Sequence, residues 1–205
     1  MKPAAITYSF FLQEFDVRDV WNRFETWLSA HWPEGLGGLN PPATDEQIAA
    51  LQESIGLALP EDFVACLRIH NGQSSLVGGL FDGAEFLSTD EVLNQWKIWK
   101  GLLDGGEFAG IVSDPARGVR NDWWHPGWIP FTHNGGGDHL CLDLAPGASG
   151  SPGQVITMWH DSGERDCIAP DFGTWFTSYT KRAFSGDIVY SDEYGCLIDR
   201  QDAGL

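Results

Sequence analysis

The densest group of side chains that could do chemistry lies in residues 133–139, which read HNGGGDH, with Asp143 a few residues further on. Two histidines and two aspartates are groups that bind zinc and other divalent metals. In a regular strand, however, Asp138 and His139 point to opposite faces, and no HExxH motif or cysteine pair accompanies them. The glycines instead favour a hairpin in which Asn134 and Asp138 bond backbone groups. We therefore predict no metal here, and keep as the alternative an enzyme centred on His133, Asp138, His139 and Asp143.

Other catalytic patterns in the chain are incomplete. The glycine run 135–137 could cradle a phosphate, but such loops precede a helix and carry a lysine or arginine, whereas a strand and acidic residues surround this one. Cys66 and His70 are one helical turn apart and could touch. A buried cysteine near a histidine on an apolar helix face is more often a core residue than a catalytic one. No GxSxG motif is present. We predict that the chain is not an enzyme and has no catalytic, cofactor-binding or metal-binding residue.

Three tryptophans lie within the six residues 123–128, which read WWHPGW. If this segment is extended, the three indoles cannot all face one core, and tryptophan is enriched at the energetic centres of protein interfaces. The alternative is that the rings pack beneath the glycine- and charge-rich surface loop 104–122. We predict a partner-binding surface in this region, formed by Trp123, Trp124, His125 and Trp128 together with Asp104, Glu107, Asp114, Asp122 and Asp138.

The 205-residue chain is strongly acidic, with 12 basic and 29 acidic residues and a formal net charge of −17. The surplus is spread along the chain: −7 in residues 1–63, −5 in 64–160 and −5 in 161–205. Such a surface repels nucleic acid and anionic lipid, and it attracts basic proteins at long range. We therefore expect a protein partner, and neither a nucleic acid nor a membrane, although solubility alone would also account for the charge.

The four cysteines, at positions 66, 141, 167 and 196, are too far apart for a metal or redox pair. They lie in apolar segments, where a free thiol behaves as a small buried hydrophobe. No secretory leader is predicted, since Gln13, Glu14 and Asp16 interrupt the apolar residues near the N-terminus. No segment approaches the run of about eighteen apolar residues that a membrane span needs. These features predict a cytoplasmic protein with reduced thiols.

Apolar periodicity predicts helices near residues 16–31, 44–55, 60–70, 88–103 and 171–184, with capping residues at Thr44 and Ser88. Strands at 128–132, 139–144, 154–160 and 166–169 are joined by short turns, which indicates an antiparallel meander. A further short strand is expected near 188–190. The predicted fold is a single α+β domain with helices packed on one face of a mostly antiparallel sheet, and we expect the other face to be partly open.

A series of motifs follows in a fixed order along the chain: LPEDF at 59–63, HNG at 70–72, WW at 123–124, WIPF at 128–131, GGGDHLCLDL at 135–144, GQV at 153–155 and DFGTWF at 171–176. Their order and spacing resemble the SUKH superfamily of Smi/Knr-type proteins over residues 40–182. The resemblance implies an α+β domain there. Residues 1–39, predicted to be a helical extension packed on the domain, and residues 183–205, a C-terminal extension, lie outside it.

The resemblance also implies a function without catalysis or a cofactor. Proteins of this kind include fungal regulators of cell-wall assembly and bacterial immunity proteins, which bind and block toxins, often nucleases, delivered by neighbouring cells. With the acidic charge, it predicts an immunity protein that neutralises a basic toxin domain encoded nearby. A regulatory scaffold related to cell-wall assembly is the alternative. The motif residues are expected to be structural, and the oligomeric state is left open between a monomer and a weak dimer.

Overall fold

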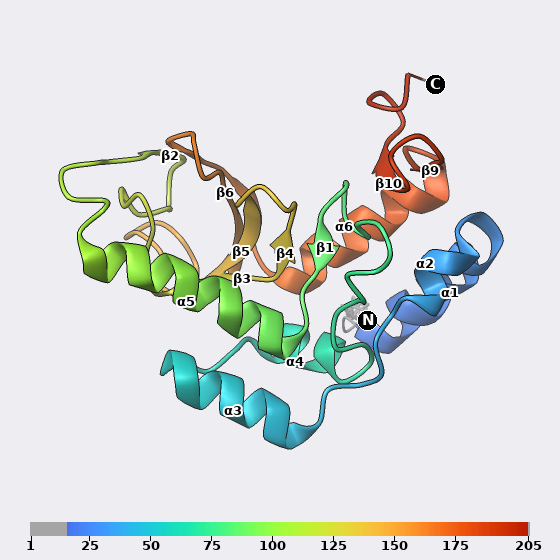
Figure 1. Cartoon of the computed structure of the whole chain (residues 1–205), viewed down its shortest axis with the longest axis horizontal. Helices are drawn as coiled ribbons and strands as arrows, with labels where there is room; N and C mark the ends of the chain where they lie inside the picture. Colours follow the sequence, from blue (N-terminus) through green and yellow to red (C-terminus); the bar gives the residue numbers. More distant parts are fainter. Residues whose placement is uncertain (1–15, 205) are drawn as a thin grey trace, which may run out of the picture.

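The computed structural model describes residues 16–204, which form helices around a small central sheet (Figure 1). The prediction about a secretory leader, and the first part of the predicted extension 1–39, concern residues 1–15 and lie outside the described residues. Within residues 16–204, no helix is both long enough and apolar enough to cross a bilayer. Figure 1 shows α1 (Val17–His31), α2 (Pro33–Gly37) and the hairpin of β9 (Ile188–Ser191) and β10 (Cys196–Asp199) at one end of the molecule, and the sheet with the 106–122 segment at the other.

Two of the first four helices begin at side-chain caps. Helix α1 (Val17–His31) starts at Asp16, whose carboxylate accepts the Arg18 N–H, and the short α2 (Pro33–Gly37) follows. Helix α3 (Asp45–Ile55) has a complete capping box at Thr44 and ends at a glycine in the left-handed region. Helix α4 (Glu61–Leu67) has two acidic residues in its first turn. The capping box at Thr44 is as predicted, whereas α2 and α4 have no side-chain cap.

Helix α5 (Thr89–Gly105) extends two residues into the predicted loop 104–122. The rest of that loop is tied to the protein at β2 (Asp114–Pro115), which pairs in parallel with β7 (Glu164–Arg165). Three of its residues, Ser113, Gly118 and Val119, are buried. Part of this segment therefore packs against the domain, whereas a surface loop was predicted. A second small sheet joins β1 (Glu85–Phe86) to β4 (Thr132–His133).

The central sheet has four antiparallel strands in the order β3 (Trp128–Pro130), β5 (His139–Asp143), β6 (Gln154–Met158) and β8 (Cys167–Ala169). This confirms the predicted α+β class and the meander. Every residue of β6 is buried, and so are four of the five in β5. Because successive side chains point to opposite faces, both faces of the sheet are covered at β5 and β6. The expectation of a partly open face is therefore wrong for the centre of the sheet, against which α5 and α6 (Phe172–Ser185) pack, whereas Cys167 and Ile168 of the edge strand β8 are exposed.

Helix α6 (Phe172–Ser185) and the hairpin of β9 (Ile188–Ser191) and β10 (Cys196–Asp199) complete the domain. The predicted boundary at 182/183 falls inside α6. Ile188 and Leu197 of the hairpin are fully buried in the same hydrophobic cluster as the central helices. That cluster is rich in aromatic rings, among them Trp21, Phe24, Phe63, Phe81, Phe86, Phe131, Phe172, Trp175, Phe176 and Tyr179.

Candidate partner-binding groove

The histidine at the centre of the enzymatic alternative is locked inside the fold. The Nδ1 of His139 donates to the Thr132 carbonyl at 2.7 Å, and its Nε2 accepts from the indole N–H of Trp99 at 3.1 Å. Burial, aided by the neighbouring His133, lowers the pKa of His139 to about 4. The ring is therefore neutral at physiological pH, and both of its nitrogens already have partners.

The aspartates of the same alternative bond to other groups. Asp143 is fully buried, and its carboxylate accepts from the Gln154 amide at 2.8 Å and from the Ala145 backbone N–H at 3.0 Å. Burial raises the pKa of Asp143. Asp138 lies in the hairpin before β5 and pairs with His160. His139, Asp143 and Asp138 thus bond to separate groups within the protein. The ring of His133 stacks on His139 with a centroid distance of 5.1 Å, and its buried Nδ1 has no hydrogen-bond partner among the described residues.

Cys66 and His70 form no catalytic pair either. The Cys66 thiol accepts from the Trp21 indole at 3.2 Å, and burial raises the pKa of this thiol far above its usual range. The Nε2 of His70 lies 2.8 Å from the Glu25 carboxylate, and its Nδ1 lies 3.0 Å from the Asn40 carbonyl. A thiol held in its neutral form is a poor nucleophile. Among the cysteines, Cys167 is exposed, which corrects the prediction that all four are buried.

The tryptophan segment 123–128 belongs largely to the core. Trp128 is fully buried and Trp124 is 2% exposed, so the prediction that these two rings contact a partner is wrong. The indole of Trp124 stacks on Trp99 of α5 with a centroid distance of 6.5 Å, because α5 covers this part of the chain. Trp123 is half-buried, and the Arg165 guanidinium lies 5.1 Å from the centre of its ring.

The other seven residues of that predicted surface remain accessible in part, and their role in binding stays a prediction. Asp104 pairs with Lys100, one turn earlier on α5, at 2.5 Å, and Asp122 pairs with Arg120 at 2.7 Å. Trp123, His125, Asp122 and Asp138 are half-buried, whereas Asp104, Glu107 and Asp114 are exposed.

A groove of about 500 Å³ opens between the sheet and α6, away from residues 104–128. Its walls come from β4, β5 and β8, from the residue that follows β6, from α6 and from the turn 81–84. The lining is mostly apolar and includes Leu140, Trp159, Ile168 and Trp175. Of the nine predicted partner-binding residues, Asp138 is the one that lines it. An apolar groove of this size with a few polar groups at its edges is typical of a ligand or peptide site.

Trp159, directly after β6, distinguishes this groove from the rest of the surface. All ten tryptophans lie within the described residues; nine belong to the buried hydrophobic cluster or pack against it, and Trp159 does neither. Its indole is half-buried and lines the groove, so it has apolar surface available to a partner. The sequence pattern did not single it out, because it reads as the end of a buried strand. Its position beside the turn 161–163 was the one local sign that its ring could lie outside the core.

One group of charged residues lies around Arg182 of α6, which lines the groove. Its guanidinium donates to Asp82 at 3.3 Å and to Asp199 at 2.7 Å. Asp82 has a positive φ of 49° and Gly83 follows with 78°, the type I′ turn that an Asp-Gly pair favours. Tyr179 fixes this turn, since its hydroxyl donates to the Leu80 carbonyl at 2.8 Å. Burial raises the pKa of Asp82, although Arg182 opposes the shift.

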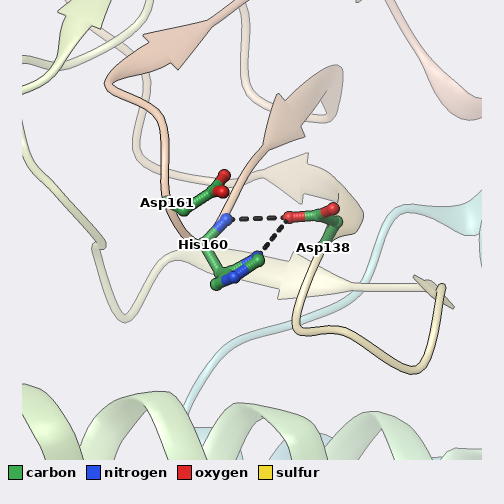
Figure 2. A group of neighbouring side chains, drawn as sticks. All are labelled: Asp138, His160 and Asp161. Carbon is green, nitrogen blue, oxygen red and sulfur yellow. Dashed lines mark hydrogen bonds and ion pairs between the residues drawn. The ribbon is translucent and has the colours of Figure 1, made fainter.

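A second group of charged residues joins Asp138, which also lines the groove, to the turn that follows Trp159 (Figure 2). One carboxylate oxygen of Asp138 accepts from both the backbone N–H and the Nδ1 of His160, each at 2.9 Å, and the other accepts from Asn134 at 2.7 Å. Figure 2 shows the Asp161 carboxylate beside this pair. The bond to Asp138 raises the pKa of His160, and the bonds from His160 and Asn134 hold the pKa of Asp138 below its usual value.

Asp138, His160 and Asp161 are the residues best placed to hold a metal, since their ligand atoms lie within 4.8 Å of one another. Their bonds favour a structural role, because both oxygens of Asp138 already accept from protein donors. The cluster joins the glycine hairpin to the end of β6. Gly137 permits this approach: its φ is +108°, and a Cβ there would lie 3.1 Å from the Cβ of His160. Asn134 bonds two backbone N–H groups of the hairpin, as predicted.

The motif residues of the sequence hold distant segments together. Asp62 accepts the backbone N–H of Gly173 at the start of α6, at 2.8 Å, and Gln154 joins Asp143 to the 118 carbonyl. Asn71 accepts the Thr89 N–H at 2.8 Å at the start of α5. These motif residues therefore connect distant segments, which agrees with the expectation that they are structural.

Comparison with known proteins assigns the domain to a family. The model of the SMI1 / KNR4 family (SUKH-1) matches residues 42–178, and the chain belongs to this family. The resemblance seen in the sequence is thereby confirmed. The matched residues include β5, β6, β8 and the first half of α6. They therefore include every residue that lines the groove except Tyr179 and Arg182.

Two of the relatives described next are named as regulators of the cell wall or of glucan synthesis, and a third is named as an F-box protein. The chain is 25% identical to the "Cell wall assembly regulator SMI1" of Saccharomyces cerevisiae, over 85% of this chain and 42% of that protein. It is 24% identical to the "Glucan synthesis regulatory protein" of Neurospora crassa, over 83% and 39%. It is 28% identical to the human "F-box only protein 3", over 83% and 35%. The chain thus spans about two fifths of the length of the wall regulators that it matches.

Proposed function

We propose that the chain is a protein-binding domain without catalytic activity, that it acts in the regulation of cell-wall assembly, and that the groove is its binding site. The observation that carries the proposal is Trp159, a half-buried indole that lines an apolar groove and takes no part in the core. Residues of this kind supply most of the binding energy at protein interfaces.

Two further observations support a binding role. His139, Asp143 and Cys66 are buried groups that bond within the protein, and the pKa values of His139 and Cys66 favour their uncharged forms. Relatives that share the domain are named as regulators of wall assembly and of glucan synthesis. A wall-assembly role therefore ranks above the immunity role that the sequence first suggested.

The experiment is a deletion of the gene in its own host, complemented with the wild-type chain or with Trp159→Ala. We expect the deletion to change wall glucan content and sensitivity to a wall-binding dye. The wild-type chain should restore both, and Trp159→Ala should restore neither at equal abundance. An unchanged wall in the deletion strain contradicts the proposed role in wall assembly.

The net charge of −17 favours one second candidate, an immunity protein for a basic toxin. Acidic surfaces accelerate encounter with basic proteins and make it dependent on salt. Co-expression with the product of a neighbouring gene tests this candidate. Rescue of growth from a toxic neighbour, together with an isolable complex, supports immunity, whereas the absence of any toxic neighbour contradicts it.

A further inference from the structure

We infer that the groove binds an extended segment of a partner protein in which an apolar side chain is flanked by lysine or arginine. This inference rests on the proposed binding function, and it adds the chemistry of the occupant. It is carried by three features of the groove: its apolar lining, an edge strand beside it and two groups of mainly acidic residues in and beside its wall.

The apolar lining suits one large aliphatic or aromatic side chain. Trp159 is half-buried without core contacts, and Ile168 is 44% exposed although it is a large hydrophobic residue. Leu140 of β5 and Trp175 of α6 complete the lining. Burying the free surfaces of Trp159 and Ile168 against an apolar side chain removes them from water, which is the main favourable term in such an interface.

The edge strand suits an extended backbone. Among the strands that residues 16–204 form, β8 pairs with β6 and with no other, so it is one edge of the four-stranded sheet. Ile168, Ala169 and Pro170 line the groove from this edge. A segment that lies along β8 presents alternate side chains to the groove, as in peptide recognition by strand addition. Pro170 limits the contact to a short segment, because proline has no N–H to donate.

The charges in and beside the groove wall suit basic flanks. Arg182 pairs with the carboxylates of Asp82 and Asp199, and Asp82 lines the groove with it. Asp138 also lines the groove, and Asp161 lies beside it in the cluster with His160. Each of these two groups has more acidic than basic residues, so a lysine or arginine near either one meets complementary charge.

The test uses the whole chain and fluorescein-labelled nine-residue peptides, with binding followed by fluorescence polarisation. The probe has a central leucine or tryptophan, two lysines or arginines on each side, and glycine-serine ends. One matched peptide has serine in place of the basic residues, and another has glycine at the centre. We expect the probe to bind at least tenfold more tightly than either matched peptide.

Paired variants test the place of binding. Trp159→Ala and Ile168→Asp should weaken binding of the probe at least tenfold. The controls are Trp27→Ala, at another half-buried tryptophan, and Ile98→Asp, at another exposed isoleucine. These two variants should change the affinity for the probe less than twofold. Trp159→Phe keeps an aromatic ring, so it should lose less than Trp159→Ala, which separates loss of contact from loss of folding. The double variant Asp82→Asn/Asp161→Asn should bind the probe no better than the serine-flanked peptide.

Equal binding of the basic-flanked and serine-flanked peptides, or binding that Trp159→Ala leaves unchanged, overturns the inference. So does the absence of binding by any of the peptides. These failures are distinguishable from failure of the proposed function. If the peptides fail while Trp159→Ala still abolishes complementation of the wall defect, the groove remains the binding site and the chemistry of the occupant is wrong.

Discussion

The buried His139 makes the stability of the domain depend on pH in a way that the structure lets us work out. The pKa of an unfolded histidine is about 6.5, whereas burial lowers that of His139 in the folded protein to about 4. Between these two values the unfolded chain binds a proton that the folded chain does not. The stability due to the neutral ring is therefore complete above pH 6.5 and is lost progressively as the pH falls to 4.

The size of this loss follows from the shift. A difference of about 2.5 pKa units corresponds to about 3 kcal/mol of unfolding free energy. That is a large share of the roughly 5–15 kcal/mol by which a typical domain is stable. His160 acts in the opposite direction, because its bond to Asp138 raises its pKa, so the total pH dependence of the protein combines several groups.

A comparison with His139→Gln isolates the contribution of this ring. Glutamine does not titrate in this range, and the other groups are common to both proteins. Urea unfolding at a series of pH values between 7.5 and 4 should give a stability difference that favours the wild type at pH 7.5. That difference should fall by about 3 kcal/mol on acidification. Titration of the His139 ring by NMR in the wild type measures its pKa directly and does not depend on the variant. Parallel stability curves, or a ring that titrates near pH 6.5, would refute the reasoning.

Other residues allow shorter tests. Gly72 has a φ of +71° and no room for a Cβ against the 87–88 backbone. Gly72→Ala should therefore lower the free energy of unfolding, measured in urea, by at least about 2 kcal/mol. A loss well below about 1 kcal/mol contradicts this. Cys167 is the exposed thiol, so a thiol reagent should modify one cysteine in the native protein and all four in denaturant; rapid modification of two or more native thiols contradicts the burial. The His160–Asp138 pair stabilises most between about pH 4 and 6.5, because its contribution is lost as the pH falls through the lowered pKa of Asp138 and as it rises through the raised pKa of His160. Asp138→Asn should therefore destabilise most in that range, and a larger effect at pH 9 contradicts the pairing.

Local features of the sequence predicted the elements well. The capping box at Thr44, the side-chain cap at Ser88 and the glycines after α3 and α5 depend on residues within a few positions of one another. The Asn134–Asp138 hairpin is also local, because Asn134 bonds the N–H groups of the same turn. Interactions over such short distances along the chain are readable from its residues alone.

The candidate site depended on contacts between distant residues. Trp124 and Trp128 are buried because α5 packs over them, and the composition of their own segment contains no sign of this. Trp159 directly follows the buried strand β6, yet its ring lies outside the core. Asp138 and His160 are 22 residues apart and meet only when β5 and β6 pair. Which aromatic ring is left for a partner is therefore a property of the packed domain.

The central claim is that Trp159 and its groove bind a basic-flanked apolar segment. The most direct test is NMR of the uniformly labelled chain, with the indole N–H signals assigned, during titration with the lysine- and leucine-containing probe. The account predicts shifts at the Trp159 indole and at the backbone of Leu140 and Ile168, with the Trp27 indole unchanged. Saturable binding that leaves Trp159 unshifted and perturbs residues of another face would contradict it.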